Sequence, residues 1–135
     1  MSRRNGRDRP ITVGEQGGRY TLLAQARVAD GAWSRGVGLI GTRQLAAGEG
    51  LVIYPCSSVH TFFMRMPIDV VYVSRTGQVI DVDRRLKPWR IGKLHRGVRY
   101  VIETASGGAD RVQPGDVLQI IGWAPGRKRW AQVQR

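Results

Sequence analysis

The sequence IDVVYVSRTGQVIDVD, residues 68–83, contains two apolar runs separated by Arg75-Thr76-Gly77. Both runs are rich in β-branched residues, and a short connection that contains glycine is typical of a β-hairpin. In the first run, Ile68, Val70 and Tyr72 would share one face of the strand, and the valines at the alternate positions would share the other. Because both faces are apolar, we expect this strand to be covered on both sides.

The rest of the chain also consists of short apolar runs between turn residues. Five further segments predict strands, at residues 19–28, 51–54, 60–64, 98–104 and 117–121. Asp30 is a good N-cap residue, so we expect a short helix that ends before Gly41. Residues 106–112 predict a weak helical turn, and 86–97 a long loop. The predicted fold is therefore mainly β, a compact sandwich or barrel-like domain with one or two short helices.

Length and composition predict one domain with no membrane span. The chain has 135 residues, enough to bury a core without cross-links, and we expect a β domain at 10–122 between basic tails at 1–9 and 123–135. No apolar run approaches the roughly 20 residues that a membrane-spanning helix needs. The first arginines are not followed by the apolar stretch of a secretion signal, and the single cysteine, Cys56, cannot form an internal disulfide. We therefore expect a cytoplasmic protein.

The chain is strongly basic. It has 22 Lys and Arg against 10 Asp and Glu, a net charge of +12, and 19 of the basic residues are arginines. Such an excess attracts polyanions whatever the fold. Two interpretations stay open: a compositional preference for arginine on a solvated surface, or a surface that binds nucleic acid or anionic lipid.

The longest cluster of positive charge lies between residues 84 and 99, where no acidic residue occurs. Its members are Arg84, Arg85, Lys87, Arg90, Lys93, Arg96 and Arg99. Trp89 and His95 lie among them, and a loop that carries arginine beside tryptophan suits single-stranded nucleic acid or phosphate. The other interpretation is a solvated loop whose Trp89 packs on the β domain. No motif for sequence-specific base readout is present.

Residues 55–69 place ionisable side chains inside an apolar run, where they need partners. We favour a hydrogen-bonded network of His60, Thr61, Arg65 and Asp69 there, in which Arg65 bonds unpaired backbone carbonyls or pairs with Asp69 or Asp30. The second interpretation makes the same residues the polar wall of a pocket with an apolar lining of Trp33, Phe62, Met64 and Trp89. The residues of this predicted ligand site are His60, Arg65, Asp69, Trp89 and Arg90.

Two chemical interpretations of the same segment are weaker. Cys56 and His60 would form a nucleophile–base pair only if the segment turned, because an extended chain separates them by about 13 Å. Zinc usually needs four ligands at paired spacings, and this chain has one cysteine and two distant histidines. We therefore predict no catalytic residue, no metal site and no cofactor.

The motif Cys-x-x-Val-His-Thr-Phe-Phe-Met-Arg-x-Pro-Ile-Asp-Val-Val, residues 56–71, resembles the signature of domain-of-unknown-function family 192. Two further blocks agree with that family, one within residues 28–41 and one that begins at 99–103 and continues to Gly115-Asp116. The resemblance implies a compact β domain with short helices. It implies no activity, because none is established for the family and a fold does not carry a function with it.

These observations favour a binding or accessory module over an enzyme. The first hypothesis is a β domain that binds a small anionic ligand or a protein partner in a cleft lined by His60, Arg65 and residues 84–96. The alternative is a nucleic-acid-associated regulatory protein that uses the basic loop, with Arg84, Arg85, Lys87, Arg90, Lys93 and Arg96, together with both tails.

Overall fold

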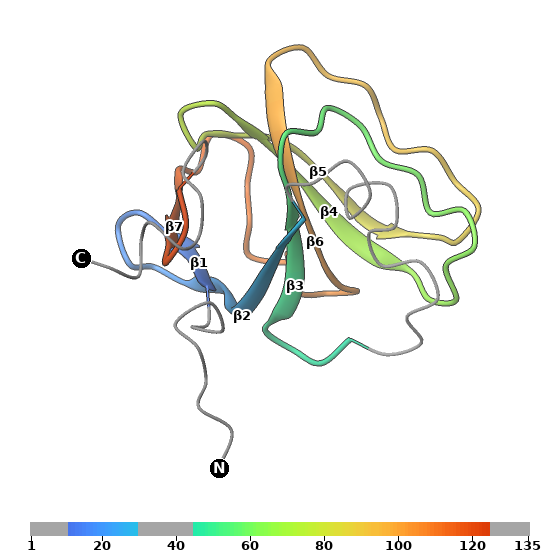
Figure 1. The fold of residues 1–135 in the computed structure, drawn as a ribbon, viewed down its shortest axis with the longest axis horizontal. Coiled ribbons are helices and arrows are strands. Elements are labelled where there is room, and N and C mark those ends of the chain that lie inside the picture. The colour runs from blue at the N-terminus through green and yellow to red at the C-terminus, as the bar shows by residue number, and fades with distance from the viewer. Residues whose placement is uncertain (1–10, 30–44, 125–135) are drawn as a thin grey trace.

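The structure is a computed structural model that describes residues 11–29 and 45–124. They form seven strands of one sheet (Figure 1). The strands are β1 (Ile11–Glu15), β2 (Thr21–Ala29), β3 (Glu49–Ile53), β4 (Ile68–Ser74), β5 (Val79–Leu86), β6 (Val98–Ala105) and β7 (Leu118–Ile121). Their order in the sheet is β5-β4-β6-β3-β2-β1-β7, and only the β2–β3 pair is parallel.

The two ends of this sheet meet, which gives the domain its barrel-like form. β5 and β7 are the outermost strands, yet Gln78 forms an isolated bridge with Val117. The Val79 N–H donates to the Asp116 carbonyl at 2.7 Å, and the Leu118 N–H donates to the Gly77 carbonyl at 2.8 Å. The predicted mainly β fold of sandwich or barrel type is therefore confirmed.

The predicted hairpin and its two buried faces are also confirmed. β4 pairs with β5 on one side and with β6 on the other. Ile68, Val70 and Tyr72 belong to one apolar cluster, and Val71 and Val73 belong to a second cluster. β4 is thus a central strand with a core on each face, and its alternation in sequence is sufficient to predict this.

Three expectations about secondary structure need comment. The helix after Asp30 falls on residues 30–44, which lie outside the described residues. Residues 106–111, where a weak helical turn was predicted, form consecutive turns closed by hydrogen bonds between residues three positions apart, such as Gly108 N–H to the Ala105 carbonyl, and no regular helix. Residues 60–64 were predicted as a strand, and this is wrong: only His60 makes an isolated bridge, and a turn follows it. Phe63 has a φ of 63°, and such a residue cannot continue an extended strand.

Two core elements lie outside the predicted strands. β1 was not predicted, although Ile11 and Val13 alternate in sequence and both are completely buried. Trp123 was placed at the start of the C-terminal tail, but its side chain is buried in the larger apolar cluster. Within residues 11–29 and 45–124, no helix has the length and apolar character that crossing a membrane requires.

Candidate functional site: an exposed aromatic and basic surface

Two long loops lie side by side at one end of the domain (Figure 1). The first loop, residues 54–67, joins β3 to β4, and the second loop, residues 87–97, joins β5 to β6. The N–H of Thr61 donates to the Arg90 carbonyl at 2.8 Å, and the N–H of Gly92 donates to the Val59 carbonyl at 2.8 Å. The loops are therefore connected by a short ladder of backbone hydrogen bonds outside the main sheet.

Thr61 is the polar centre of this ladder. Its side chain is fully buried, and its hydroxyl donates to the Lys87 carbonyl at 2.6 Å and accepts from the Arg90 N–H at 2.8 Å. Its own carbonyl accepts from the Trp89 N–H at 2.9 Å. A buried polar network does exist in this segment, and Thr61 is the residue that connects it to the second loop.

A second contact fixes the loop pair to the sheet. The buried Tyr72 on β4 donates its hydroxyl to Asp83 Oδ2 at 2.7 Å, and the Lys93 N–H donates to the same oxygen at 3.3 Å. Gly92 lies directly above this hydroxyl, because a Cβ at position 92 would be 2.2 Å from Tyr72 Oη. Glycine is thus needed for the second loop to approach the core this closely.

With their backbones held in this way, the loops present aromatic side chains to solvent. The ring of His60 stacks on Phe62 at 4.9 Å between centroids, and Trp89 lies 6.0 Å from Phe62 and 4.7 Å from Phe63. Phe63 is 62% exposed, Trp89 is 56% exposed, and Ile91, the bridge partner of His60, is 69% exposed. More than half of the Trp89 side chain is therefore exposed to solvent, whereas one interpretation of the sequence placed it against the β domain.

The backbone at the two most prominent aromatic residues is strained. Phe63 has a φ of 63° and Trp89 a φ of 64°, both in the left-handed region that side chains of this size rarely adopt. Each such residue costs on the order of 1–3 kcal/mol, and residues of this kind concentrate at functional sites. Neither side chain is buried, so core packing does not offset this strain. The strain therefore indicates that the exposed rings have a function.

Three exposed cations lie in these loops within two positions of Phe63 or Trp89 in sequence: Arg65, Lys87 and Arg90. Residues 11–29 and 45–124 offer none of the three an acidic partner within ion-pair distance. We call the set His60, Phe62, Phe63, Arg65, Lys87, Trp89, Arg90 and Ile91 the aromatic–basic surface.

Three other residues of the predicted nucleic-acid set, Arg84, Arg85 and Lys93, have partners within the chain. Arg84 donates to the Val112 carbonyl, and Arg85 lies 3.8 Å from a carboxylate oxygen of Asp110. Lys93 Nζ is 3.9 Å from Asp83 Oδ1. Arg96 is exposed on the second loop. The basic cluster therefore contains two groups of residues. Some have partners within the chain, and the others remain available to a ligand.

Asp69 does not lie on this surface. Its carboxylate is fully buried and accepts from three backbone N–H groups, those of Arg85 at 2.8 Å and of Gly107 and Ala109 at 3.0 Å each. The predicted pairing of Arg65 with Asp69 is wrong, because backbone amides take both oxygens. Asp69 instead anchors the turn after β6 to β4. The other predicted partner, Asp30, and the pocket residue Trp33 lie outside the described residues.

Cys56 and His60 each have a local hydrogen-bond partner. The Cys56 thiol donates to the Ser58 carbonyl at 2.9 Å. His60 Nδ1 accepts from the Phe62 N–H at 3.2 Å, which helps to hold the imidazole against the Phe62 ring. His60 therefore serves as part of the aromatic stack in this structure.

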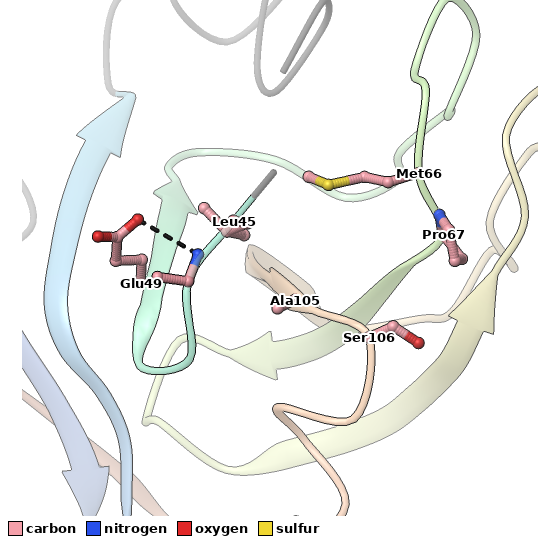
Figure 2. A pocket seen from close by; sticks show the side chains of 7 residues that line it. Leu45, Glu49, Met66, Pro67, Ala105 and Ser106 are labelled. Carbon is pink, nitrogen blue, oxygen red and sulfur yellow. Dashed lines mark hydrogen bonds between the residues drawn. The ribbon is translucent and has the colours of Figure 1, made fainter. Parts of the chain in front are cut away.

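Two features of the molecule were not identified from sequence. One is a cavity lined by Leu45, Ala46, Glu49, Met66, Pro67, Ala105 and Ser106 (Figure 2). The other is Glu103 on β6, a buried carboxyl group whose pKa burial raises to about 7. The sequence signal for Glu103 was a single acid within the apolar strand that begins at Val98, which is a typical sign of a group with a special role.

Comparison with known proteins places this architecture among uncharacterised proteins. The family model DUF192, described as "Uncharacterized ACR", matches residues 12–120. UPF0127 protein PH1112 of Pyrococcus horikoshii is 34% identical over 102 residues, which cover 70% of this chain and 86% of that protein. A UPF0127 protein of Thermococcus sibiricus is 33% identical over 75 residues, which cover 56% of this chain and about half, 47%, of that protein.

Two solved structures share the fold. A protein of unknown function from Novosphingobium aromaticivorans has a TM-score of 0.70 at 21% identity and covers 82% of this chain and 83% of its own. A "putative transcription regulator" from Sinorhizobium meliloti has a TM-score of 0.70 at 24% identity and covers 84% of this chain and 93% of its own. At these identities the likeness shows the fold alone.

Proposed function

The chain belongs to DUF192, an uncharacterised family, and from its surface we propose that it is a cytoplasmic binding module that recognises a partner protein through the aromatic–basic surface. The recognised segment would present apolar side chains next to Asp or Glu. The single observation that carries this proposal is the display of Phe63 and Trp89, both largely exposed and both held in a strained backbone conformation.

The composition of the surface supports a protein ligand. Aromatic residues and Arg are enriched at protein interfaces, and Trp and Arg are among the residues whose truncation costs most binding energy. Ile91, at 69% exposure, adds an aliphatic contact that an apolar side chain would cover. Arg65, Lys87 and Arg90 in the same two loops would attract carboxylates and so favour an acidic partner.

The rigid support of the surface argues in the same direction. The ladder from Thr61 to Arg90 and the contact of Gly92 with Tyr72 hold both loops before any partner arrives. A surface that is organised in advance loses less conformational entropy when it binds. The predicted small-ligand interpretation has less support here, because His60 and Arg65 are both exposed and neither lines the described cavity.

Selection from a random peptide library displayed on phage, with the full chain as bait, tests the proposal. We expect the selected peptides to combine aromatic or aliphatic residues with Asp or Glu. Synthetic copies should shift the amide NMR signals of residues 60–65 and 87–91. Trp89→Ala and Phe63→Ala should each weaken binding at least tenfold.

A matched control is available in Ile121, which is 57% exposed on β7, away from the two loops. Ile121→Ala should leave peptide binding unchanged. If it weakened binding as much as Trp89→Ala does, or if the selected peptides carried no acidic residues, the proposed surface would be wrong.

The alternative function is association with nucleic acid, which two observations favour. The net charge is +12, and Trp89 with Arg90 offers stacking together with charge. One structural neighbour is also named as a "putative transcription regulator". The affinity for a twelve-nucleotide oligothymidylate, measured at physiological salt, distinguishes the two functions. Binding that is tighter than that of any selected peptide, and that is lost in Trp89→Ala, would replace the protein-partner proposal with this one.

A further inference from the structure

The short ladder between the two loops has an open outer edge at Ile91. His60 and Ile91 face each other in an antiparallel bridge. Both backbone hydrogen bonds of the ladder are made by the residues directly before and after this pair. A pair placed between such bonds exchanges none itself, and its own backbone groups point away from the opposite strand. The N–H and C=O of Ile91 are therefore directed away from the first loop.

These two backbone groups have no partner within residues 11–29 and 45–124. Ile91 is also 69% exposed, so this edge faces solvent. The main sheet behaves differently, because β5 and β7 are joined through Gln78 and Val117 where they meet. Since an open strand edge is a template for pairing with another chain, the backbone of Ile91 is a candidate pairing site.

Gly92 shows which way the Ile91 side chain points. A Cβ at position 92 would meet Tyr72 Oη, so this face of the ladder is turned toward the core. Successive residues of a strand point to opposite faces, which turns Ile91 outward. A residue paired with Ile91 would place its own side chain on the same outer face, with the two Cβ atoms about 4.5–5.5 Å apart. A β-branched or aromatic side chain at that position would cover Ile91.

The same loops hold most of the large apolar side chains that are exposed in the described part of the chain. Four of these five belong to the two loops: Phe63, Trp89, Ile91 and Leu94. Trp89 and Leu94 are five positions apart, at most about 17 Å along the chain. An extended segment of about six residues centred on Ile91 is therefore long enough to contact both.

Charge decides between a second copy of this chain and an acidic partner at this edge. The second loop contains no acid and four exposed cations: Lys87, Arg90, Lys93 and Arg96. Two copies paired at Ile91 would bring two such loops together, and like charges on adjacent strands destabilise the pairing. A segment with Asp or Glu beside its apolar residues would instead meet complementary charge. Nucleic acid lacks the peptide groups that continue a β ladder.

We infer that the partner binds as an extended segment that adds a strand to the second loop, with its backbone hydrogen-bonded to the N–H and C=O of Ile91. The segment carries a β-branched or aromatic residue opposite Ile91 and Asp or Glu at flanking positions. This binding mode rests on the proposed function and specifies the conformation and the residue pattern of the recognised segment. In strand addition, main-chain hydrogen bonds supply affinity and alternate side chains supply specificity. Thr61 and Gly92 already hold the loop, so the edge is in place before the partner arrives.

Backbone methylation of the tightest-binding peptide from the phage selection tests this binding mode. Each copy of the peptide carries one methylated backbone nitrogen and so lacks one donor. Methylation of the nitrogen that donates to the Ile91 C=O should weaken binding at least tenfold. Methylation of the nitrogens directly before and after it, which point away from the loop, should weaken binding less than threefold. Equal losses at successive nitrogens, or no loss at any of them, would overturn strand addition.

The natural chain provides a direct readout that needs no variant. With ¹⁵N-labelled protein and ¹³C-labelled peptide, a scalar coupling through the hydrogen bond should join the Ile91 amide nitrogen to one carbonyl carbon of the peptide. Hydrogen exchange at the Ile91 amide should slow at least tenfold in the complex. A peptide that binds at residues 60–65 and 87–91 but leaves this exchange unchanged would overturn strand addition alone. A selection that yields no binding peptide would refute the proposed function, and strand addition with it.

Ile91→Pro removes the donor from the chain itself. Both ladder hydrogen bonds remain, because neither uses the Ile91 N–H, and proline is tolerated at strand edges whose N–H faces solvent. The matched control is Ile91→Ala, which loses most of the side chain but keeps the donor. Ile91→Pro should bind the selected peptide at least tenfold more weakly than Ile91→Ala, while the Gly92 amide of the free variant stays protected from exchange. Equal affinity of the two variants would contradict the role of the N–H, and if the proline disturbs the ladder, the coupling in the natural chain decides.

Sedimentation of the natural chain tests the other occupant of the edge. We expect a monomer at all concentrations, because the like charges of two second loops repel each other. A dimer that forms as concentration rises, with the Ile91 amide protected in it, would assign the edge to a second copy and overturn the inference.

Discussion

Replacing Glu103 with Gln should change how the stability of this protein depends on pH, and the size of the change follows from the structure. Leu51 and Val70 flank Glu103 on the two neighbouring strands, and burial is the cause that raises its pKa from 4.5 to about 7. The folded protein therefore holds the proton more tightly than the unfolded chain between these two pH values.

The sign of the effect is as follows. Because the folded state binds more protons than the unfolded state between pH 4.5 and about 7, stability due to Glu103 falls as pH rises through that interval. The loss is complete above pH 7. At about 1.4 kcal/mol per pH unit it amounts to roughly 3 kcal/mol. Gln does not titrate, so the Glu103→Gln variant lacks this contribution.

The assay is urea denaturation followed by tryptophan fluorescence at pH 4, 5.5, 7 and 8, with linear extrapolation to water. The free energy of unfolding of the natural chain minus that of Glu103→Gln should decrease by about 3 kcal/mol from pH 4 to pH 8. Differences cancel the titration of all other groups. A constant difference across the series would show that Glu103 ionises as easily in the folded protein as in the unfolded one.

Glu15→Gln is an internal control with the opposite sign. The backbone N–H of Arg19 donates to the Glu15 carboxylate and lowers its pKa, and the Arg19 guanidinium assists. The stability contributed by Glu15 is therefore present above pH 4.5 and is lost as pH falls. The difference between the natural chain and Glu15→Gln should therefore increase with pH only up to about pH 4.5, and it should stay constant through the interval in which the Glu103 difference decreases.

Three further predictions concern the anchors of the loops and turns. Thr61→Val keeps the shape of the side chain but removes the hydroxyl between the loops. We expect a loss of about 2 kcal/mol in unfolding free energy and faster hydrogen exchange at the Arg90 amide. Protection of that amide equal to its protection in the natural chain would contradict the role of Thr61. Gly92→Ala should lower the unfolding free energy by about 1–3 kcal/mol, because the new Cβ clashes with Tyr72 Oη. In a double-mutant cycle, combining it with Tyr72→Phe should recover part of that loss. Fully additive effects of the two substitutions would exclude the clash. Asp69→Asn should destabilise by about 3 kcal/mol in urea melts, since the amide nitrogen cannot accept from the backbone N–H groups that now bond the carboxylate; a loss below about 1 kcal/mol would refute the anchoring role.

The architecture of the sheet was largely predictable because strand formation and burial leave a signal with a period of two residues. In β4 the alternation of Ile68, Val70 and Tyr72 against the valines between them correctly indicated two buried faces. The hairpin with β5 followed from the short glycine-containing connection. In β1 the same alternation is limited to Ile11 and Val13, and so short a run beside a polar segment gives a weaker signal.

The candidate sites were predictable only in outline. The sequence drew attention to residues 55–69 and to the basic loop, but it could not assign their side chains to surface or interior. Phe62, Phe63 and Met64 form a continuous apolar run that looks like a strand, whereas the structure turns at Phe63 and exposes its ring. Asp69 looked like a partner for an arginine, and only the fold brings three backbone amides to it.

Local sequence was thus enough to specify a β domain with a central strand buried on both faces, since side-chain alternation depends only on neighbours along the chain. Tertiary structure decided the rest. Thr61 meets Arg90 across 29 positions, and Glu103 is isolated because two other strands place Leu51 and Val70 beside it. Such contacts join residues far apart in sequence, so no local pattern records them, and the proposed partner surface depends on the contact of Thr61 with Arg90.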